Sequence, residues 1–125
     1  MIEIILLICG SRSIELDKEL LDDIINKHDL KDITEVISGG ARGPDHTAII
    51  WARSKGIKCT VMKADWNKYG KKAGILRNRE MAEMCDVCLS VWDGSSVGTA
   101  STMSFVEELN KPLYVEEYKE WIDGQ

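Results

Sequence analysis

The chain has 125 residues, of which 44% are hydrophobic and 30% charged, and its formal net charge is −5. This length suits one domain, expected to span residues 1–125, and the composition is that of a globular protein. An acidic chain lacks the broad basic face that binds nucleic acids or anionic membranes, so neither is an expected partner. The apolar run at residues 2–9 is too short to cross a bilayer and lacks the basic start of a secretory signal, which predicts a cytoplasmic location.

The first unit of the chain reads as strand, turn and helix. Residues 2–9 are almost unbroken isoleucine and leucine, as in a strand covered on both faces of a parallel sheet, and we expect this strand to be central. Gly10, Ser11 and Arg12 then form a turn. From Leu16 to Ile25 apolar residues recur at helical spacing, which predicts an amphipathic helix.

The second unit carries a glycine-rich motif, Ser-Gly-Gly-Ala-Arg-Gly-Pro-Asp, at residues 38–45. It follows a short strand at residues 35–38 and precedes a helix expected over residues 46–54. Pro44 suits the first helical position, so the helix N-terminus, with its free N–H groups, would lie beside Gly39, Gly40 and Gly43. Such a corner binds anions, and Arg42 adds a guanidinium that can hold a phosphate in two hydrogen bonds.

A basic connection follows the third strand, which is expected at residues 58–62. Residues 64–74 form a long loop with two aromatic side chains, and long loops in small domains are often functional. Trp66 or Tyr69 would either stack on a base or hold the loop against the core. The helix expected over residues 75–85 presents Arg77 and Asn78 in its first turns, and this cationic stretch of an acidic chain favours a small anionic ligand.

A second glycine turn follows the fourth strand, expected at residues 86–92. The small residues of this turn and of the helix start after it are Gly94, Ser95, Ser96, Gly98 and Thr99. The turn lacks the lysine of a Walker A loop, so hydrolysis of nucleoside triphosphates is not indicated. The helix that it opens is expected to continue through Leu109, followed by a fifth strand at residues 112–115 and a short helix at residues 118–122.

Alternating strands and helices predict an α/β fold, a Rossmann-like doubly wound sheet with helices on both faces. We expect five parallel strands in the order 3-2-1-4-5. In that order the turns after strands one, two and four meet in one cleft at the carboxyl ends of the strands, where such sheets bind ligands.

The four cysteines are expected to be free thiols, with no metal and no cofactor. Cys85 and Cys88 have the spacing of a zinc or redox pair, but they lie where a helix runs into a strand, and a thioredoxin-type pair lies where a strand runs into a helix. Cys9 and Cys59 do not supply a second pair at metal-ligand spacing. Packing in the core is therefore the predicted role.

Five ordered motifs occur along the chain: Gly10-Ser11-Arg12, residues 38–45, Ala64-Asp65-Trp66 with Tyr69-Gly70, residues 73–78, and Gly98-Thr99-Ala100. Together they resemble the YspA-like, cpYpsA-related family of the SLOG superfamily. The resemblance extends over residues 4–115. It implies a Rossmann-like fold that binds nucleotides or nucleotide-derived signals, in a family that occurs in bacteria and their phages. The family is similar to the LOG-type phosphoribohydrolases, which cleave the N-glycosidic bond of nucleoside monophosphates and are commonly dimers, so the resemblance implies a homo-oligomer.

The LOG-type signature, Pro-Gly-Gly-x-Gly-Thr-x-x-Glu, aligns with residues 94–102, where Gly98 and Thr99 match. The catalytic glutamate is replaced by Thr102. Glycosidic cleavage passes through an oxocarbenium-like state that a carboxylate stabilises, and threonine carries no charge for this task. Asp45, Asp65 and Asp93 are the alternatives, and Asp45 is the candidate catalytic residue because it lies within the glycine motif.

Three functions therefore remain open: a nucleotide-binding protein that acts as sensor or sequesters its ligand, a phosphoribohydrolase, and a partner-binding module without a ligand. The first is preferred. Its ligand-binding residues are predicted to be Gly10, Ser11, Arg12, Gly39, Gly40, Arg42, Gly43, Asp45, Trp66, Tyr69, Arg77, Asn78, Gly94, Ser95, Ser96, Gly98 and Thr99.

Overall fold

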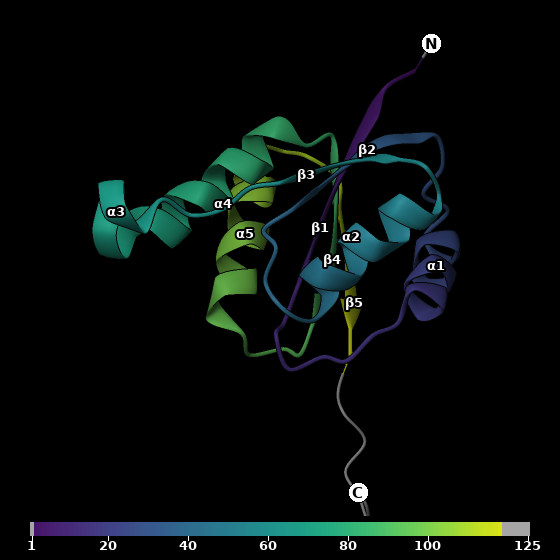
Figure 1. The fold of residues 1–125 in the computed structure, drawn as a ribbon, viewed down its shortest axis with the longest axis horizontal. Helices are drawn as coiled ribbons and strands as arrows, with labels where there is room; N and C mark the ends of the chain where they lie inside the picture. Colours follow the sequence, from purple (N-terminus) through teal and green to yellow (C-terminus); the bar gives the residue numbers. More distant parts are fainter. Residues whose placement is uncertain (1, 119–125) are drawn as a thin grey trace, which may run out of the picture.

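A parallel sheet organises residues 2–118, the part of the chain that the computed structural model describes (Figure 1). Its five strands are β1 (Ile4–Gly10), β2 (Ile33–Ser38), β3 (Lys58–Val61), β4 (Val87–Trp92) and β5 (Leu113–Glu117). They pair in the order β3-β2-β1-β4-β5, and each pairing is parallel. The predicted α/β fold, strand order and central first strand are confirmed.

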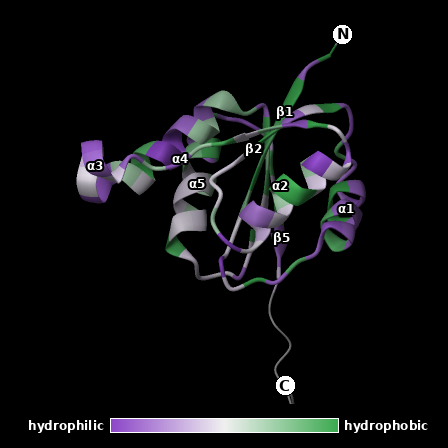
Figure 2. Ribbon diagram, viewed as in Figure 1, coloured by the Kyte–Doolittle hydropathy of each residue, from purple (hydrophilic) through white to green (hydrophobic). Residues whose placement is uncertain are grey.

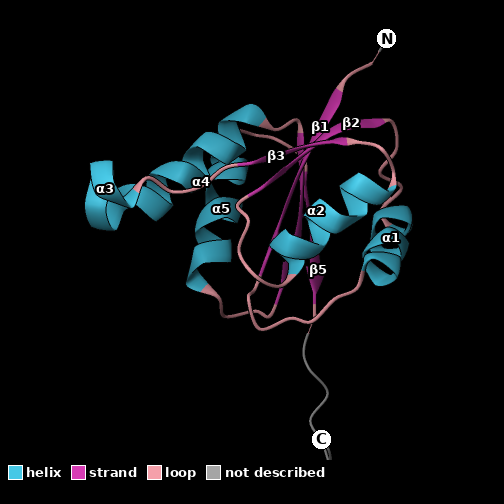
Figure 3. Ribbon diagram, viewed as in Figure 1, coloured by secondary structure: helices cyan, strands magenta, loops and turns pink. Residues whose placement is uncertain are grey.

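Helices cover both faces of this sheet, as Figure 3 shows. The helical segments are α1 (Lys18–Lys27), α2 (Pro44–Ser54), α3 (Trp66–Tyr69), the 3-10 turn η1 (Gly70–Lys72), α4 (Ala73–Met84) and α5 (Val97–Glu108). Helices α1 and α2 pack against each other on one face, and α4 and α5 do so on the other. This is the three-layer arrangement expected of a doubly wound sheet.

The side chains of β1 alternate between two apolar cores, one on each face of the sheet. Leu6 and Ile8 are fully buried with residues of α1 and α2, while Leu7 and Cys9 join residues of α4 and α5. Figure 2 shows hydrophobic colouring along β1 and on parts of the helices that cover the sheet. A strand buried on both faces has no position for a polar side chain, which explains the unbroken apolar run in the sequence.

Local hydrogen bonds fix the helices on the α1–α2 face. The carboxylate of Asp17 accepts the backbone N–H of Leu20 at 2.8 Å and caps the start of α1. Pro44 occupies the first turn of α2, as predicted. The indole Nε1 of buried Trp51 donates to Asp22 at 2.9 Å and links α2 to α1.

The connection between β3 and α4, expected to be a long loop over residues 64–74, differs most from the prediction. It contains α3 and η1, which project away from the sheet, and α4 begins at Ala73, two residues before the expected start (Figure 1).

The helix expected over residues 118–122 lies outside the described residues except for Tyr118. No helix within residues 2–118 is long and apolar enough to cross a membrane.

All four cysteines are free thiols in the structure, as predicted. Cys85 and Cys88 are buried together with Cys9 in the core beneath α4 and α5, and the Sγ atoms of Cys9 and Cys88 are 3.9 Å apart. Among the described residues, no group of three or more histidine, cysteine or acidic side chains is placed to hold a metal ion. Cys9, Cys85 and Cys88 contribute to the packing of this core, and Cys59 is partly buried against the core on the other face.

The tight contact at the end of β1 gives the first prediction. A Cβ at Gly10 would lie 2.5 Å from the Pro44 ring and from the carbonyl oxygen of Val91. Gly10→Ala is therefore expected to lower the free energy of unfolding by about 1–3 kcal/mol through overpacking, measured by urea denaturation. Gly98→Ala is the control, because a Cβ there meets no heavy atom within 4 Å. Equal losses in both variants would contradict this account of the contact.

Candidate functional site

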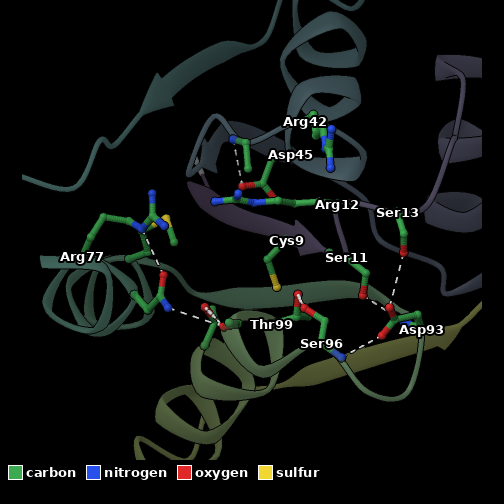
Figure 4. Close-up of a pocket in the computed structure, with 16 residues that line it drawn as sticks. Cys9, Ser11, Arg12, Ser13, Arg42, Asp45, Arg77, Asp93, Ser96 and Thr99 are labelled. Carbon is green, nitrogen blue, oxygen red and sulfur yellow. Dashed lines mark hydrogen bonds between the residues drawn. The ribbon is translucent and has the colours of Figure 1, made fainter. Parts of the chain in front are cut away.

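The carboxyl ends of β1, β2 and β4 surround a cavity of about 450 Å³, here called the inner cavity (Figure 4). Its walls come from the turns after these three strands and from the facing sides of α4 and α5. The lining residues are Cys9, Gly10, Ser11, Arg12, Ser13, Ala41, Arg42, Asp45, Arg77, Asn78, Met81, Asp93, Ser96, Gly98, Thr99 and Thr102.

The turn after β1 is fastened to the end of β4. The backbone N–H of Ser11 donates to the carbonyl oxygen of Val91 at 3.0 Å. The Ser11 hydroxyl in turn accepts the backbone N–H of Asp93 at 3.0 Å. These two bonds hold Ser11 in the floor of the inner cavity, and they leave the longer side chain of Arg12 exposed at its mouth.

The turn after β2 positions Asp45 through a chain of hydrogen bonds. The hydroxyl of Ser38 accepts the backbone N–H of Gly40 at 3.1 Å and donates to the backbone carbonyl of Asp45 at 2.8 Å. The carboxylate of Asp45 accepts the backbone N–H of Ala41 at 3.3 Å. Asp45 is thus held at the N-terminus of α2 and lines the inner cavity.

The Asp45 carboxyl is buried, with 7% of the residue exposed. Burial raises its pKa to about 6, although the hydrogen bond from Ala41 and the charge of Arg77 favour the ionised form. A carboxyl with such a pKa exchanges a proton near neutral pH, which is a property of many functional sites.

Arg77 connects α4 to the ends of two strands. Its Nη1 donates to the backbone carbonyls of Gly39 at 3.1 Å and Met62 at 3.2 Å, and its Nε donates to the Asn78 side chain at 3.0 Å. A Cβ at Gly39 would lie 2.9 Å from this Nη1 and 3.0 Å from the Asp45 carboxylate, so a larger residue there would displace one of these two side chains. Arg77 lines the inner cavity and also fixes the turns that form its walls.

In the turn after β4, the side chain of Asp93 binds the backbone N–H groups of the two serines that follow Gly94. The Asp93 carboxylate accepts the backbone N–H of Ser95 at 2.9 Å and of Ser96 at 2.8 Å, and these bonds lower its pKa to about 2. Two residues in the first turn of α5, Gly98 and Thr99, line the inner cavity and carry backbone N–H groups near the helix start. A helix leaves such groups without an intrahelical acceptor.

The structure leaves seven of the predicted ligand-binding residues outside the lining of the inner cavity. They are Gly39, Gly40, Gly43, Trp66, Tyr69, Gly94 and Ser95. The glycines shape the adjoining turns, and the Ser95 N–H is bound by Asp93. Trp66 and Tyr69 lie on the projecting helix α3, 60% and 45% exposed, and neither stacks over the inner cavity nor fills the core.

Six lining residues were absent from the predicted set: Cys9, Ser13, Ala41, Met81, Asp93 and Thr102. Helical spacing could have identified two of them, because Met81 follows Arg77 by four positions and Thr102 follows Gly98 by four. The Thr102 hydroxyl donates to the carbonyl of Gly98 at 3.3 Å. The position of the LOG-type glutamate thus does lie in the cavity wall, with its hydroxyl bonded back into α5.

Comparison with known proteins identifies the family. Residues 4–69 match the model of the YspA, cpYpsA-related SLOG family. The chain is also 44% identical over 84 residues to the Gene 61 protein of Mycobacterium phage D29, and the alignment covers 62% of this chain and 67% of that protein. No solved structure gives a significant match. The protein belongs to the YspA, cpYpsA-related SLOG family, and the matched region includes the turns after β1 and β2.

The buried carboxyl gives a prediction about pH. Because burial raises the Asp45 pKa from 3.8 to about 6, the folded state favours the protonated form, and stability falls as pH rises between these values. Asp45→Asn removes this loss. The variant is expected to exceed the wild type in free energy of unfolding at pH 7.5 by about 2–3 kcal/mol, since one pKa unit corresponds to about 1.4 kcal/mol.

At pH 3.5 the two proteins should be nearly equal, because Asp45 is then protonated in the folded state and largely protonated in the unfolded state. Urea denaturation at both pH values measures the two differences. A difference that is the same at pH 3.5 and pH 7.5 would show that ionisation of Asp45 has no special cost in the folded protein.

Proposed function

We propose that the protein binds a nucleotide or nucleotide-derived small molecule in the inner cavity, as a sensor or to sequester it. One observation carries the proposal: a single cavity brings together the N-terminus of α5, Arg12, Arg42 and Arg77. Helix N-termini and guanidinium groups are the standard partners of phosphate. The volume of about 450 Å³ suits a small molecule, and membership of a SLOG family favours a nucleotide-related ligand.

In the proposed complex a phosphate lies between Arg42, in the turn after β2, and Arg77, on α4, which both line the inner cavity (Figure 4). The N–H groups of Gly98 and Thr99 and the Thr99 hydroxyl complete its hydrogen bonds. Ser11 forms the floor. Trp66 and Tyr69 have no part in this complex, because neither lines the inner cavity and the helix that carries them, α3, projects away from the sheet (Figure 1).

Replacement of the two arginines tests this placement. Each charged hydrogen bond to a phosphate contributes about 1.5–3 kcal/mol. Arg42→Ala and Arg77→Ala are therefore each expected to weaken nucleotide binding by roughly ten- to a hundredfold, measured by calorimetry with AMP, GMP, CMP and UMP. Arg42→Lys should restore only part of the affinity, because a point charge does not reproduce the bidentate fork.

The two variants are expected to differ in stability. Arg42 is exposed, so its removal should leave the unfolding midpoint unchanged. Loss of Arg77 leaves the carbonyls of Gly39 and Met62 without their donor and should cost about 1–3 kcal/mol. Arg53→Ala, an exposed change farther along α2, is the control for affinity. Unchanged affinity in folded Arg42→Ala and Arg77→Ala would refute the phosphate position, and no binding of any nucleotide would favour a partner-binding module.

A second candidate function is hydrolysis of the N-glycosidic bond of a nucleoside monophosphate. One observation favours it: the Asp45 carboxyl lines the inner cavity with a pKa of about 6, so part of the population holds a proton at neutral pH. A general acid of this kind could protonate a departing base.

Incubation with the four monophosphates, followed by chromatography for free base, tests the hydrolase function. If Asp45 is the acid, Asp45→Asn should abolish base release while calorimetry still detects nucleotide binding. Base release that persists in Asp45→Asn would show that another group, not Asp45, acts as the general acid. Nucleotide binding by the wild type without any base release would leave binding alone as the function.

A further inference from the structure

A second cavity of about 460 Å³, the outer cavity, adjoins the inner one. It lies between the segment that leads from β1 to α1 and the N-terminus of α2. Arg12, Ser13 and Arg42 line both cavities and so stand at the boundary between them. Glu15 and His46 line only the outer cavity.

We propose that the ligand is a nucleoside diphosphate joined to a second sugar, with its two ends in the two cavities. This inference rests on the proposed function and specifies the class of ligand. The nucleoside and first phosphate occupy the inner cavity, the second phosphate lies at Arg12 and Arg42, and the sugar occupies the outer cavity.

The boundary between the cavities suits a phosphate. Arg12 and Arg42 are both exposed, and among the described residues neither forms a salt bridge, although Arg12 lies near enough to Asp45 for its charge to favour the ionised carboxylate. Arginine presents a planar fork of donors that matches phosphate oxygens. Two arginines at the boundary between the cavities could therefore bind the second phosphate of a ligand that extends from the inner cavity into the outer one.

The chemistry of the outer cavity favours a neutral group rich in hydroxyls over a third anion. Glu15 places a carboxylate there, which accepts hydrogen bonds from hydroxyl groups and repels phosphate. His46 adds a ring nitrogen that can bond to a hydroxyl, and buried Ile14 supplies an apolar surface. A sugar has both hydroxyl edges and an apolar face.

Hydrogen bonds between neighbouring segments support the walls of the outer cavity. The Thr47 hydroxyl, on α2, donates to the carbonyl of Leu16 at 2.6 Å and so links α2 to the segment between β1 and α1. The backbone N–H of Ile14 donates to the carbonyl of Ser11 at 3.1 Å. A Cβ at Gly43 would lie 2.9 Å from the carbonyl oxygen of Ser11, so the two walls meet closely at this point.

Calorimetry with matched series of ligands tests the proposal. The probes are AMP, ADP and ADP-ribose, with UMP, UDP and UDP-glucose and with GMP, GDP and GDP-mannose as further series. In the series whose base is accepted, the diphosphate sugar is expected to bind at least tenfold more tightly than the monophosphate. The diphosphate should fall between them.

Variants of the outer cavity separate its contribution from that of the inner one. Glu15→Gln and His46→Ala are expected to reduce affinity for the diphosphate sugar at least fivefold and to leave affinity for the monophosphate unchanged. Both side chains are exposed, so both variants should fold. Glu19→Gln, on α1 and outside both cavities, and Arg53→Ala are the matched controls and should change neither affinity.

The outcomes distinguish this inference from the function on which it rests. If monophosphates bind and no diphosphate sugar binds more tightly, or if the tighter binding is the same in Glu15→Gln and His46→Ala, the two-cavity ligand is wrong and the inner site stands. If no nucleotide of any series binds, the proposed function fails and the inference fails with it.

Discussion

The site depends on one close contact, between the last residue of β1 and the first residue of α2. Gly10 leaves no space for a side chain, because the Pro44 ring and the Val91 carbonyl already occupy the position of its Cβ. Near this contact, the ends of three strands and the start of α2 meet at one cavity. The contact also places Asp45, the residue after Pro44, beneath the turn that follows β2, where burial disfavours its charge.

The fold was predictable because its signals are local and repeated. The central strand, the strand order and the cavity at the carboxyl edge follow from alternating apolar runs and glycine turns. The direction of α3 was not predictable, because this four-residue helix buries none of its side chains and no apolar face fixes its position. The hydrogen-bond acceptors of Arg77 were not predictable either, because the carbonyls of Gly39 and Met62 are 38 and 15 residues away in sequence.

The arrangement of acids and bases is better suited to binding than to glycosidic cleavage. Hydrolysis by a pair of carboxyl groups needs one to act as acid and the other as base or nucleophile. Here Asp45 is poised to exchange a proton, whereas the Asp93 carboxylate is engaged by the N–H groups of Ser95 and Ser96. Thr102 supplies only a hydroxyl, bonded to its own helix. Asp45 is thus one carboxyl with a raised pKa in a cavity lined by three arginines, an arrangement that favours the proposed binding of an anion over cleavage.

The most direct test of the central claim is a titration of the ¹⁵N-labelled protein with nucleoside monophosphates, followed by amide NMR spectra. If the nucleotide lies in the inner cavity, the largest shifts will come from the amides of Ser11, Ala41, Gly98 and Thr99, which belong to separate segments of the chain. Shifts confined to α3, or to surface lysines without these four amides, would contradict the account.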